Sequence, residues 1–404
     1  MSIAIPGDVS ASRGTAAWGA VLSMTLGVIV LIASEFMPVS LLTPIADTLQ
    51  ISEGQAGQAI SISGVFAVLT SLASSSFVAR HDRRLVTLFF TSLLIVSGAI
   101  VALAPNYVVM MGGRALLGVA IGGFWSMSTA TIMRLVPKDA VPKALALMNG
   151  GNALAATVAA PLGSFVGSLI GWRGTFSVVV PLAAAAMAWQ FLAMPRMPPR
   201  NGEMPTGNVF RLFRHSQVVY GMAAIFLFFT GQFALFTYLR PFLETVTSVD
   251  VSTMSLILLA IGVAGLAGTS VVGAILRSRL FTLLITIPVL MAVIAVALVF
   301  LGGSTVSTAT LLGLWGLVSV PVPVVWGTWL TRTVPDDADA GGGLMVAIIQ
   351  LAITLGATVG GLLFDASGYR STFLLSALLL CGSSGLAVLT WRTAGSRGAQ
   401  KATS

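Results

Sequence analysis

The chain is a succession of long apolar runs separated by short polar stretches. A helix needs about 20 mostly apolar residues to span a bilayer, and the runs that reach this length are 18–45, 54–78, 85–104, 107–133, 143–169, 174–194, 218–243, 252–275, 280–301, 306–331, 341–364 and 371–391. Strands of an outer-membrane barrel would alternate apolar and polar residues, whereas the run 283–301 reads LLITIPVLMAVIAVALVFL. We therefore predict an all-α polytopic membrane protein with twelve transmembrane helices.

The composition supports a lipid environment and excludes several classes of site. Of 404 residues, 56% are hydrophobic and 8% are charged, whereas a soluble domain carries roughly 25% charged residues. The single cysteine, Cys381, excludes an intrachain disulfide, and the two histidines, His81 and His215, lie far apart in loops. We find no catalytic constellation either, so we expect no metal, no cofactor and no enzymatic activity.

The positive charges predict the orientation in the membrane. With the N-terminus inside, all but four of the 21 lysines and arginines fall in the termini, the cytoplasmic loops or the central linker; the exceptions are Arg114, Arg173, Arg240 and Arg370. The positive-inside rule then places both termini in the cytoplasm. The net charge of +8 reflects this topology and is dispersed along the chain, so it does not indicate nucleic-acid binding.

The chain also repeats itself at an offset of about 197 residues. GWRGTF (171–176) matches GYRSTF (368–373), TPIAD (43–47) matches RPFLE (240–244), and RLVPKDA (134–140) matches RTVPDDA (332–338). We predict two six-helix bundles, 1–194 and 218–404, joined by a polar, proline-rich cytoplasmic linker, 195–217. Two such repeats enclose a cavity near the membrane midplane that opens alternately to each side.

Two ionisable residues, Glu35 and Arg114, lie deep inside predicted spans. Such residues are costly in a membrane and are functional candidates by default. We expect Glu35 to carry the coupled proton and Arg114 to tune it. A structural ion pair between the first and fourth spans, or no contact between the two residues, is also compatible with the sequence. The repeat partner of Glu35 is Gln232, so we predict that proton coupling belongs to the N-terminal half.

Amides and aromatic residues inside the spans are candidates for substrate binding. The amides are Asn149, Asn152, Gln232 and Gln350, and the aromatic residues are Trp125, Phe236, Tyr238 and Trp326. Amides both donate and accept hydrogen bonds, which suits a neutral substrate with hydroxyls and ring nitrogens, and aromatic faces stack on flat rings. Hydrogen bonding between helices and ordinary packing are the alternatives.

Several motifs resemble those of the drug:proton antiporter branch of the major facilitator superfamily. The loop ARHDRR (79–84) is similar to the motif after the second helix, although the usual acidic residue falls on Ala79 and the usual glycine on Asp82. RALLG (114–118) resembles the basic motif of helix 4, and APLG (160–163) the antiporter motif of helix 5. The resemblance implies a gating role for the loop, and the candidates are Arg80, Asp82, Arg83 and Arg84. Whether Asp82 replaces the missing acid is open.

Other segments resemble the bacterial purine ribonucleoside efflux pumps over nearly the whole chain. They are EFMPVSLLTP (35–44), GGFWSMS (122–128), MRLVP (133–137), GQFA (231–234), FTY (236–238) and VPV (322–324) with Trp326. The resemblance implies a proton antiporter of the bacterial inner membrane that exports inosine- or guanosine-like nucleosides, and we expect it to be a monomer. Efflux of sugars or hydrophobic drugs, and a sensor that binds without transport, are the alternatives.

Overall fold

A computed structural model describes residues 17–199, 209–276, 278–334 and 338–402. Within these ranges the chain forms helices and no strand. The first half contains α1 (Trp18–Leu49), α2 (Glu53–Arg80), α3 (Arg83–Ala102), α4 (Tyr107–Leu135), the 3₁₀ helix η1 (Lys138–Ala140) and α5 (Val141–Ala193). The second half contains η2 (Val209–Arg214), α6 (Ser216–Thr237), α7 (Leu239–Thr245), α8 (Val251–Leu276), α9 (Leu280–Leu301), α10 (Thr305–Ser319), α11 (Val322–Thr333), α12 (Ala338–Ser367) and α13 (Tyr369–Ala402).

Eleven helical segments of the described chain are long and apolar enough to cross a membrane. One of them, α5, runs for 53 residues through Gly171, whose φ of 72° and ψ of 169° are not helical. This residue therefore divides α5 into two spans, which gives twelve crossings. The predicted all-helical membrane fold is confirmed.

The repeat seen in the sequence extends to the backbone. Gly171 and Gly368 begin the matched segments 171–176 and 368–373, and both have positive φ, 72° and 74°. Glycine adopts this conformation without the steric cost that a Cβ imposes. Each half thus makes the same sharp turn before its last span.

Two predicted spans each consist of two helices. The run 218–243 contains α6 and α7, which meet at Tyr238, three residues before Pro241. The run 306–331 contains α10 and α11, which meet at Val320 and Pro321. Proline lacks the N–H that would continue the hydrogen-bond ladder, and each of these breaks lies at or close to a proline.

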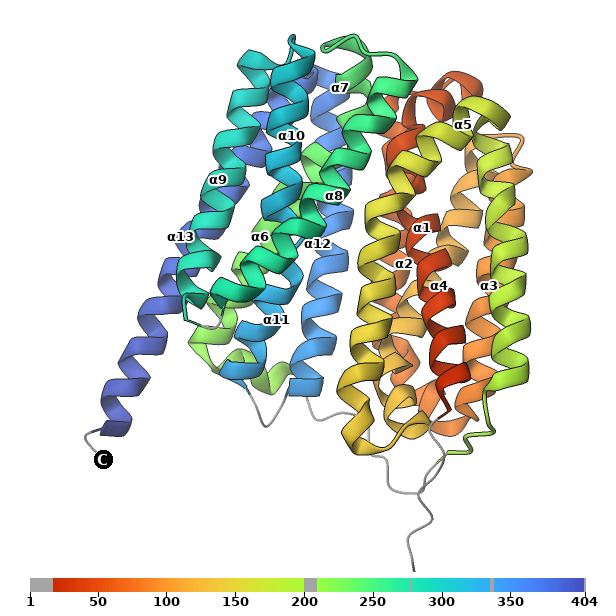
Figure 1. Ribbon diagram of the computed structural model, residues 1–404, viewed down its shortest axis with the longest axis vertical. Coiled ribbons are helices and arrows are strands. Elements are labelled where there is room, and N and C mark those ends of the chain that lie inside the picture. The colour runs from red at the N-terminus through yellow and green to blue at the C-terminus, as the bar shows by residue number, and fades with distance from the viewer. Residues whose placement is uncertain (1–16, 200–208, 277, 335–337, 403–404) are drawn as a thin grey trace, which may run out of the picture.

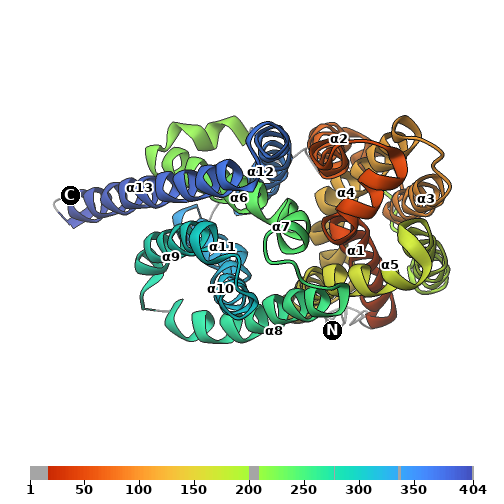
Figure 2. The same cartoon turned by 90° about the horizontal axis from the view of Figure 1, so that it is seen from above.

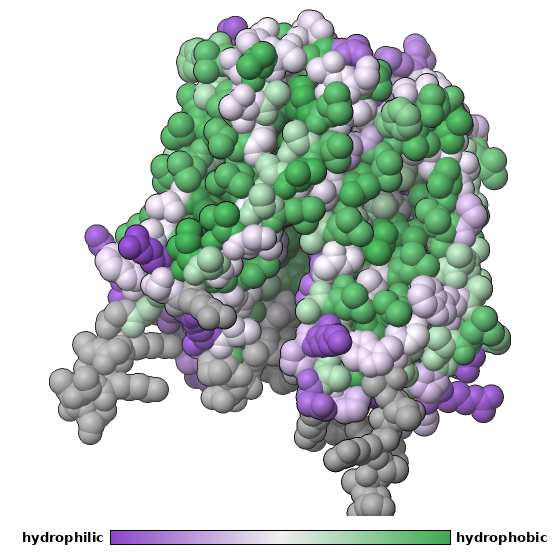
Figure 3. Space-filling model, viewed as in Figure 1, coloured by the Kyte–Doolittle hydropathy of each residue, from purple (hydrophilic) through white to green (hydrophobic). Residues whose placement is uncertain are grey.

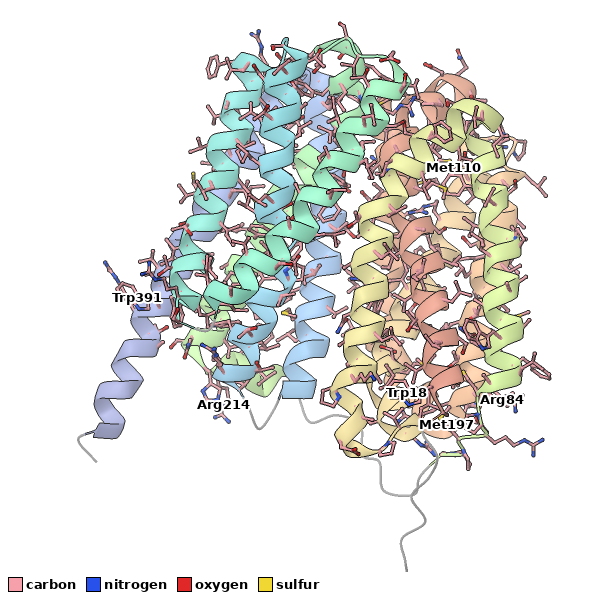
Figure 4. All side chains as sticks on the ribbon, viewed as in Figure 1. Trp18, Arg84, Met110, Met197, Arg214 and Trp391 are labelled. Carbon is pink, nitrogen blue, oxygen red and sulfur yellow. The ribbon has the colours of Figure 1, made fainter. Side chains whose placement is uncertain are left out.

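The helices form two bundles that lie side by side (Figure 1). Seen along the bundles, α2 lies beside α12 and α5 lies beside α8, so the halves meet along two seams (Figure 2). Trp18, Met197, Arg214 and Trp391 all lie towards one end of the molecule (Figure 4). We call this the linker end and the opposite end the far end.

The surface of the bundles is suited to lipid. A broad apolar band covers the sides, and polar residues gather towards the two ends (Figure 3). Large apolar side chains such as Leu72, Leu169 and Leu378 are exposed. At the linker end the surface is hollowed between the two halves (Figure 3).

Candidate substrate and proton site

Two prolines in α1 release backbone carbonyls that arginines then bind. Pro38 and Pro44 lie inside α1, and because proline has no N–H, the carbonyl four residues earlier loses its helical donor. The carbonyl of Ser34 accepts a hydrogen bond from Arg114 Nη1 at 2.7 Å. The carbonyl of Ser40 accepts one from Arg240 Nη1. The first contact stays within the N-terminal half, whereas the second joins the two halves.

Arg114 is completely buried and binds two helices at once. Its Nε donates to the carbonyl of Ala59 at 2.8 Å, and its Nη2 donates to the carbonyl of Glu35 at 3.0 Å and to Ser63 Oγ at 3.2 Å. Among the described residues, its hydrogen-bond partners are backbone carbonyls and a hydroxyl, and not the Glu35 carboxylate. Arg114 therefore holds α1 and α2 together around Glu35.

Glu35 lies at the boundary between the halves. Its side chain is 2% exposed, and Oε1 accepts a hydrogen bond from Nε2 of Gln350, in α12, at 3.3 Å. The structure thus brings the predicted proton site and a predicted substrate residue into direct contact. The predicted neighbourhood of Glu35 and Arg114 is present as well, but through the backbone of Glu35.

Aromatic rings of the two halves meet one residue after Glu35 in the sequence. Phe36, the residue after Glu35, stacks on Phe233 of α6 with ring centroids 5.6 Å apart. Phe236 meets Phe233 edge-on at 6.1 Å. Gln232 directly precedes Phe233, so its backbone lies at nearly the same level along the bundle as that of Glu35.

Two amide oxygens near this cluster have no donor within the described chain. They are Oε1 of Gln232 and Oε1 of Gln350, and both atoms are buried. A buried acceptor without a donor is costly. The pair therefore offers two hydrogen-bonding positions to a polar ligand between the halves.

The other predicted binding residues lie elsewhere. Trp125, in α4, is half-buried, and of the two asparagines of α5, Asn149 is exposed and Asn152 half-buried. Trp326 is buried in α11, edge-on to Trp329 at 5.4 Å. Within the described chain, none of these four forms a hydrogen bond or a ring contact with Glu35, so their part in substrate binding stays a prediction.

Tyr238 closes the far end rather than lining an open space in this conformation. Its hydroxyl donates to the carbonyl of Ala357 at 2.7 Å and lies 3.5 Å from the carbonyl of Gly54, which belongs to the other half. Its ring stacks on Phe364 at 5.2 Å. A role in substrate binding would require this packing to open.

Asp365 of α12 completes the closure. Its Oδ1 accepts from the backbone N–H of Gly54 at 3.0 Å, and its Oδ2 accepts from the Ser52 hydroxyl at 2.5 Å. Both donors belong to the start of α2, so a carboxylate of one half caps a helix of the other. Negative charge is favourable at a helix N-terminus.

The predicted gating loop binds the start of the linker. Oδ1 of Asp82 accepts from the backbone N–H of Arg84 at 2.8 Å and from that of Met197 at 3.0 Å. Arg84 Nη2 donates to the carbonyl of Phe191 at 2.6 Å. Arg83 is buried and Arg80 is exposed. In this conformation the hydrogen bonds of Asp82 and Arg84 hold the linker end of the N-terminal half together.

Sequence reasoning missed Asp365 and gave Arg240 no role. The repeat does not mark Asp365, because its counterpart at offset 197 is Ser168, whose hydroxyl donates to the carbonyl of Phe165 within α5. Arg240 had a signal, since Pro44 predicts a free carbonyl at Ser40. Pro38 likewise predicts a free carbonyl at Ser34.

Comparison with known proteins agrees with this architecture. The family model of the Major Facilitator Superfamily matches residues 24–338. OpdE of Pseudomonas aeruginosa strain PAO1, named a transcription regulatory protein, is 54% identical over 93% of this chain and 94% of its own. NepI of Escherichia coli K12, named a purine ribonucleoside efflux pump, is 41% identical over 90% of this chain and 91% of its own.

Solved transporter structures share the fold. A bacterial homologue of the human lysosomal transporter Spinster, inward-facing and unoccupied, superposes with a TM-score of 0.74 at 16% identity, covering 96% of this chain and 98% of its own. A D-xylose-proton symporter gives the same TM-score and identity over 94% and 98%. The chain belongs to the major facilitator superfamily, and it is a multi-pass membrane transporter rather than an enzyme.

Proposed function

We propose that this transporter exports purine ribonucleosides from the cytoplasm in exchange for protons. The observation that carries the proposal is the contact between Glu35 and Gln350, which joins a buried carboxyl of one half to an amide of the other. The similarity to NepI supports the substrate class.

The Gln350 amide suits a partner that gains and loses a proton. Its Nε2 donates to an ionised carboxylate, and its Oε1 accepts from a protonated carboxyl. Arg114 donates its hydrogen bonds to carbonyls and to Ser63. The Glu35 carboxyl is therefore bound by the Gln350 amide instead. Protonation of Glu35 therefore changes the contact between the halves directly.

The same cluster suits a neutral nucleoside. The free Oε1 atoms of Gln232 and Gln350 accept from ribose hydroxyls or purine N–H groups, and Phe36, Phe233 and Phe236 offer faces for the base. A substrate that donates to Oε1 of Gln350 competes with the protonated Glu35 carboxyl for that oxygen, whereas the ionised carboxylate stays on Nε2. This competition provides coupling between substrate and proton at one site.

The positive-inside rule assigns the linker end to the cytoplasm. The far end is closed by Tyr238, Arg240 and Asp365, and the linker end is hollowed (Figure 3). With this orientation the conformation is the one that receives substrate from the cytoplasm.

Inosine counterflow in proteoliposomes tests the substrate. We expect labelled inosine to enter vesicles preloaded with unlabelled inosine, and to accumulate in unloaded vesicles whose interior is more acidic than the medium. A protein that moves lipophilic dyes or sugars and gives no inosine counterflow would contradict the nucleoside assignment. Inosine counterflow without any response to the pH gradient would contradict proton coupling alone.

Regulation is a second candidate, favoured by the similarity to OpdE, which is named a transcription regulatory protein. In that case ligand binding shifts the conformation and the shift is the signal. Saturable inosine binding to the purified protein without counterflow would favour this candidate over export.

A further inference from the structure

A second cavity lies within the C-terminal half, away from the Glu35 cluster. It encloses about 510 Å³ at the linker end. Its lining residues are Gln217, Ser278, Arg279, Leu280, Phe281, Thr282, Trp329, Arg332, Thr333, Trp391 and Ala394. They come from α6, α9, α11 and α13 and from the turn before α9. Because α9 and α13 lie on the side of this half away from the first half (Figure 2), the cavity is separate from the seams.

The cavity is positively charged. Arg279 and Arg332 line it, and none of the described residues that line it is acidic. Neither guanidinium has a hydrogen bond or ion pair within the described part of the chain. Two arginines that lack a partner among the described residues favour an anionic ligand at this cavity, and the guanidinium group matches phosphate well.

Further donors around the cavity lack acceptors. Trp329 is fully buried, and its indole Nε1–H has no acceptor among the described residues. The first residues of the 22-residue helix α9 border the cavity, and no side chain caps that helix at Arg279. Uncapped N–H groups at a helix start attract anions. The indole N–H of Trp329 and the N–H groups at the start of α9 are two independent sets of donors, and each can bind an acceptor of a ligand.

The position of the cavity favours a lipid over a dissolved anion. Trp391 borders it and is 52% exposed, as is typical of tryptophan at the membrane–water boundary. Phe281 and Leu280 add an apolar wall beside the arginines. Arg279 and Arg332 themselves are exposed. A headgroup with attached acyl chains satisfies the charged and the apolar parts together.

We propose that this cavity binds the phosphate group of an anionic phospholipid from the leaflet at the linker end. Arg279 and Arg332 hold the phosphate oxygens, the α9 start and the Trp329 indole donate to the headgroup, and the acyl chains run along the apolar band. Basic pockets between spanning helices are suited to such headgroups.

Native mass spectrometry of the purified full chain in an equal mixture of phosphatidylglycerol and phosphatidylcholine tests this. We expect retained adducts to be enriched in phosphatidylglycerol. The double variant Arg279→Gln/Arg332→Gln should lower that enrichment by roughly tenfold or more, since each arginine near an anionic headgroup contributes separately. Both side chains are exposed, so the variant should fold.

A matched variant removes two charges from the same half and end without touching the cavity. Arg214 and Arg392 are exposed and do not line it, so Arg214→Gln/Arg392→Gln should keep the enrichment. Trp329→Phe, which removes the indole N–H, should weaken it. Equal enrichment in the wild type and the Arg279/Arg332 variant would overturn the proposal. So would inorganic phosphate that raises the melting temperature in neutral detergent as much as phosphatidylglycerol does, because the site would then take free phosphate.

Discussion

The two seams between the halves occupy equivalent places in the repeat but differ in chemistry. Along α2 and α12, Ser61 Oγ donates to the carbonyl of Thr354 at 3.1 Å and accepts from Thr358 Oγ1 at 2.9 Å, and Asp365 caps α2. Along α5 and α8, Gly262 packs directly against Thr157, and no hydrogen bond joins the two helices within the described chain. We call these the polar seam and the apolar seam.

This difference indicates different duties in a rocking transporter. Hydrogen bonds across the polar seam have defined partners, so the seam favours discrete arrangements. Small residues at the apolar seam let backbones approach closely and slide without breaking polar contacts. The Glu35–Gln350 contact involves α12 of the polar seam. A change in the protonation of Glu35 would therefore act on the polar seam, whose hydrogen bonds hold the two halves together. The apolar seam would remain free to act as the pivot.

Removing Arg114 should give the largest effect. Arg114→Leu leaves the Ser34 carbonyl, which has no helical donor because of Pro38, without a partner, and it removes the further bonds to the carbonyls of Glu35 and Ala59. It should destabilise the protein by roughly 3 kcal/mol or more, since a buried unsatisfied acceptor costs about 1–3 kcal/mol and each lost hydrogen bond to a charged group about 1.5–3 kcal/mol. Thermal unfolding in detergent measures this. Arg114→Lys should recover part of the stability, and a melting temperature unchanged by Arg114→Leu would show that α1 and α2 do not depend on this side chain.

Filling the apolar seam should have the next largest effect. A Cβ at Gly262 would lie 2.3 Å from Thr157 Cγ2 and 2.8 Å from the Thr157 carbonyl, whereas Gly273 of the same helix has nothing within 4 Å. Gly262→Val should cost about 1–3 kcal/mol through overpacking and reduce counterflow, and Gly273→Val should not. Equal counterflow in the two variants would show that the apolar seam does not need close approach.

Weakening the contact of Asp365 with the start of α2 should shift the balance between the conformations of the transporter. Asp365→Asn removes a charge from the start of α2, worth about 0.3–1 kcal/mol, and should lengthen the distance between spin labels at Thr48 and Thr245, exposed residues near the far end of each half. The labels require a Cys381→Ala background.

Asp250→Asn is the control, because Asp250 binds Ser252 and Thr253 at the start of α8 within its own half. A shift of the same size in both variants would contradict the role of Asp365 in holding the two halves together.

A single hydroxyl of the polar seam should matter least. Thr358→Val removes the hydrogen bond from Thr358 Oγ1 to Ser61 Oγ and should change stability by about 0.6 kcal/mol, the average for such bonds between membrane helices. The same spin-label pair should report a shift smaller than that of Asp365→Asn. A larger shift would show that the Ser61–Thr358 contact, rather than Asp365, holds the polar seam together.

Apolar periodicity and the repeat predict much of the fold. The matched segments at Gly171 and Gly368 predict where the last span of each half begins, and both glycines have the backbone that such a turn needs. The splits at Tyr238 and Val320 escaped prediction because the apolar runs continue through them.

The partners of the site residues were less predictable. Opposite charges suggest that Glu35 binds Arg114, but an arginine has several donors, and the carbonyls that Pro38 and Pro44 release compete for them. The contact of Glu35 with Gln350 depends on which helices face each other across the halves. The offset between the two sequence repeats carries no information about which helices of the two halves face each other.

The variant Glu35→Gln tests whether Glu35 carries the coupled proton. Inosine accumulation driven by an acidic vesicle interior should be lost, because glutamine has no proton to exchange, while inosine counterflow without a gradient should persist. Asp250→Asn, which changes an exposed carboxylate, should retain both activities. Gradient-driven accumulation at the wild-type level in Glu35→Gln would contradict the account.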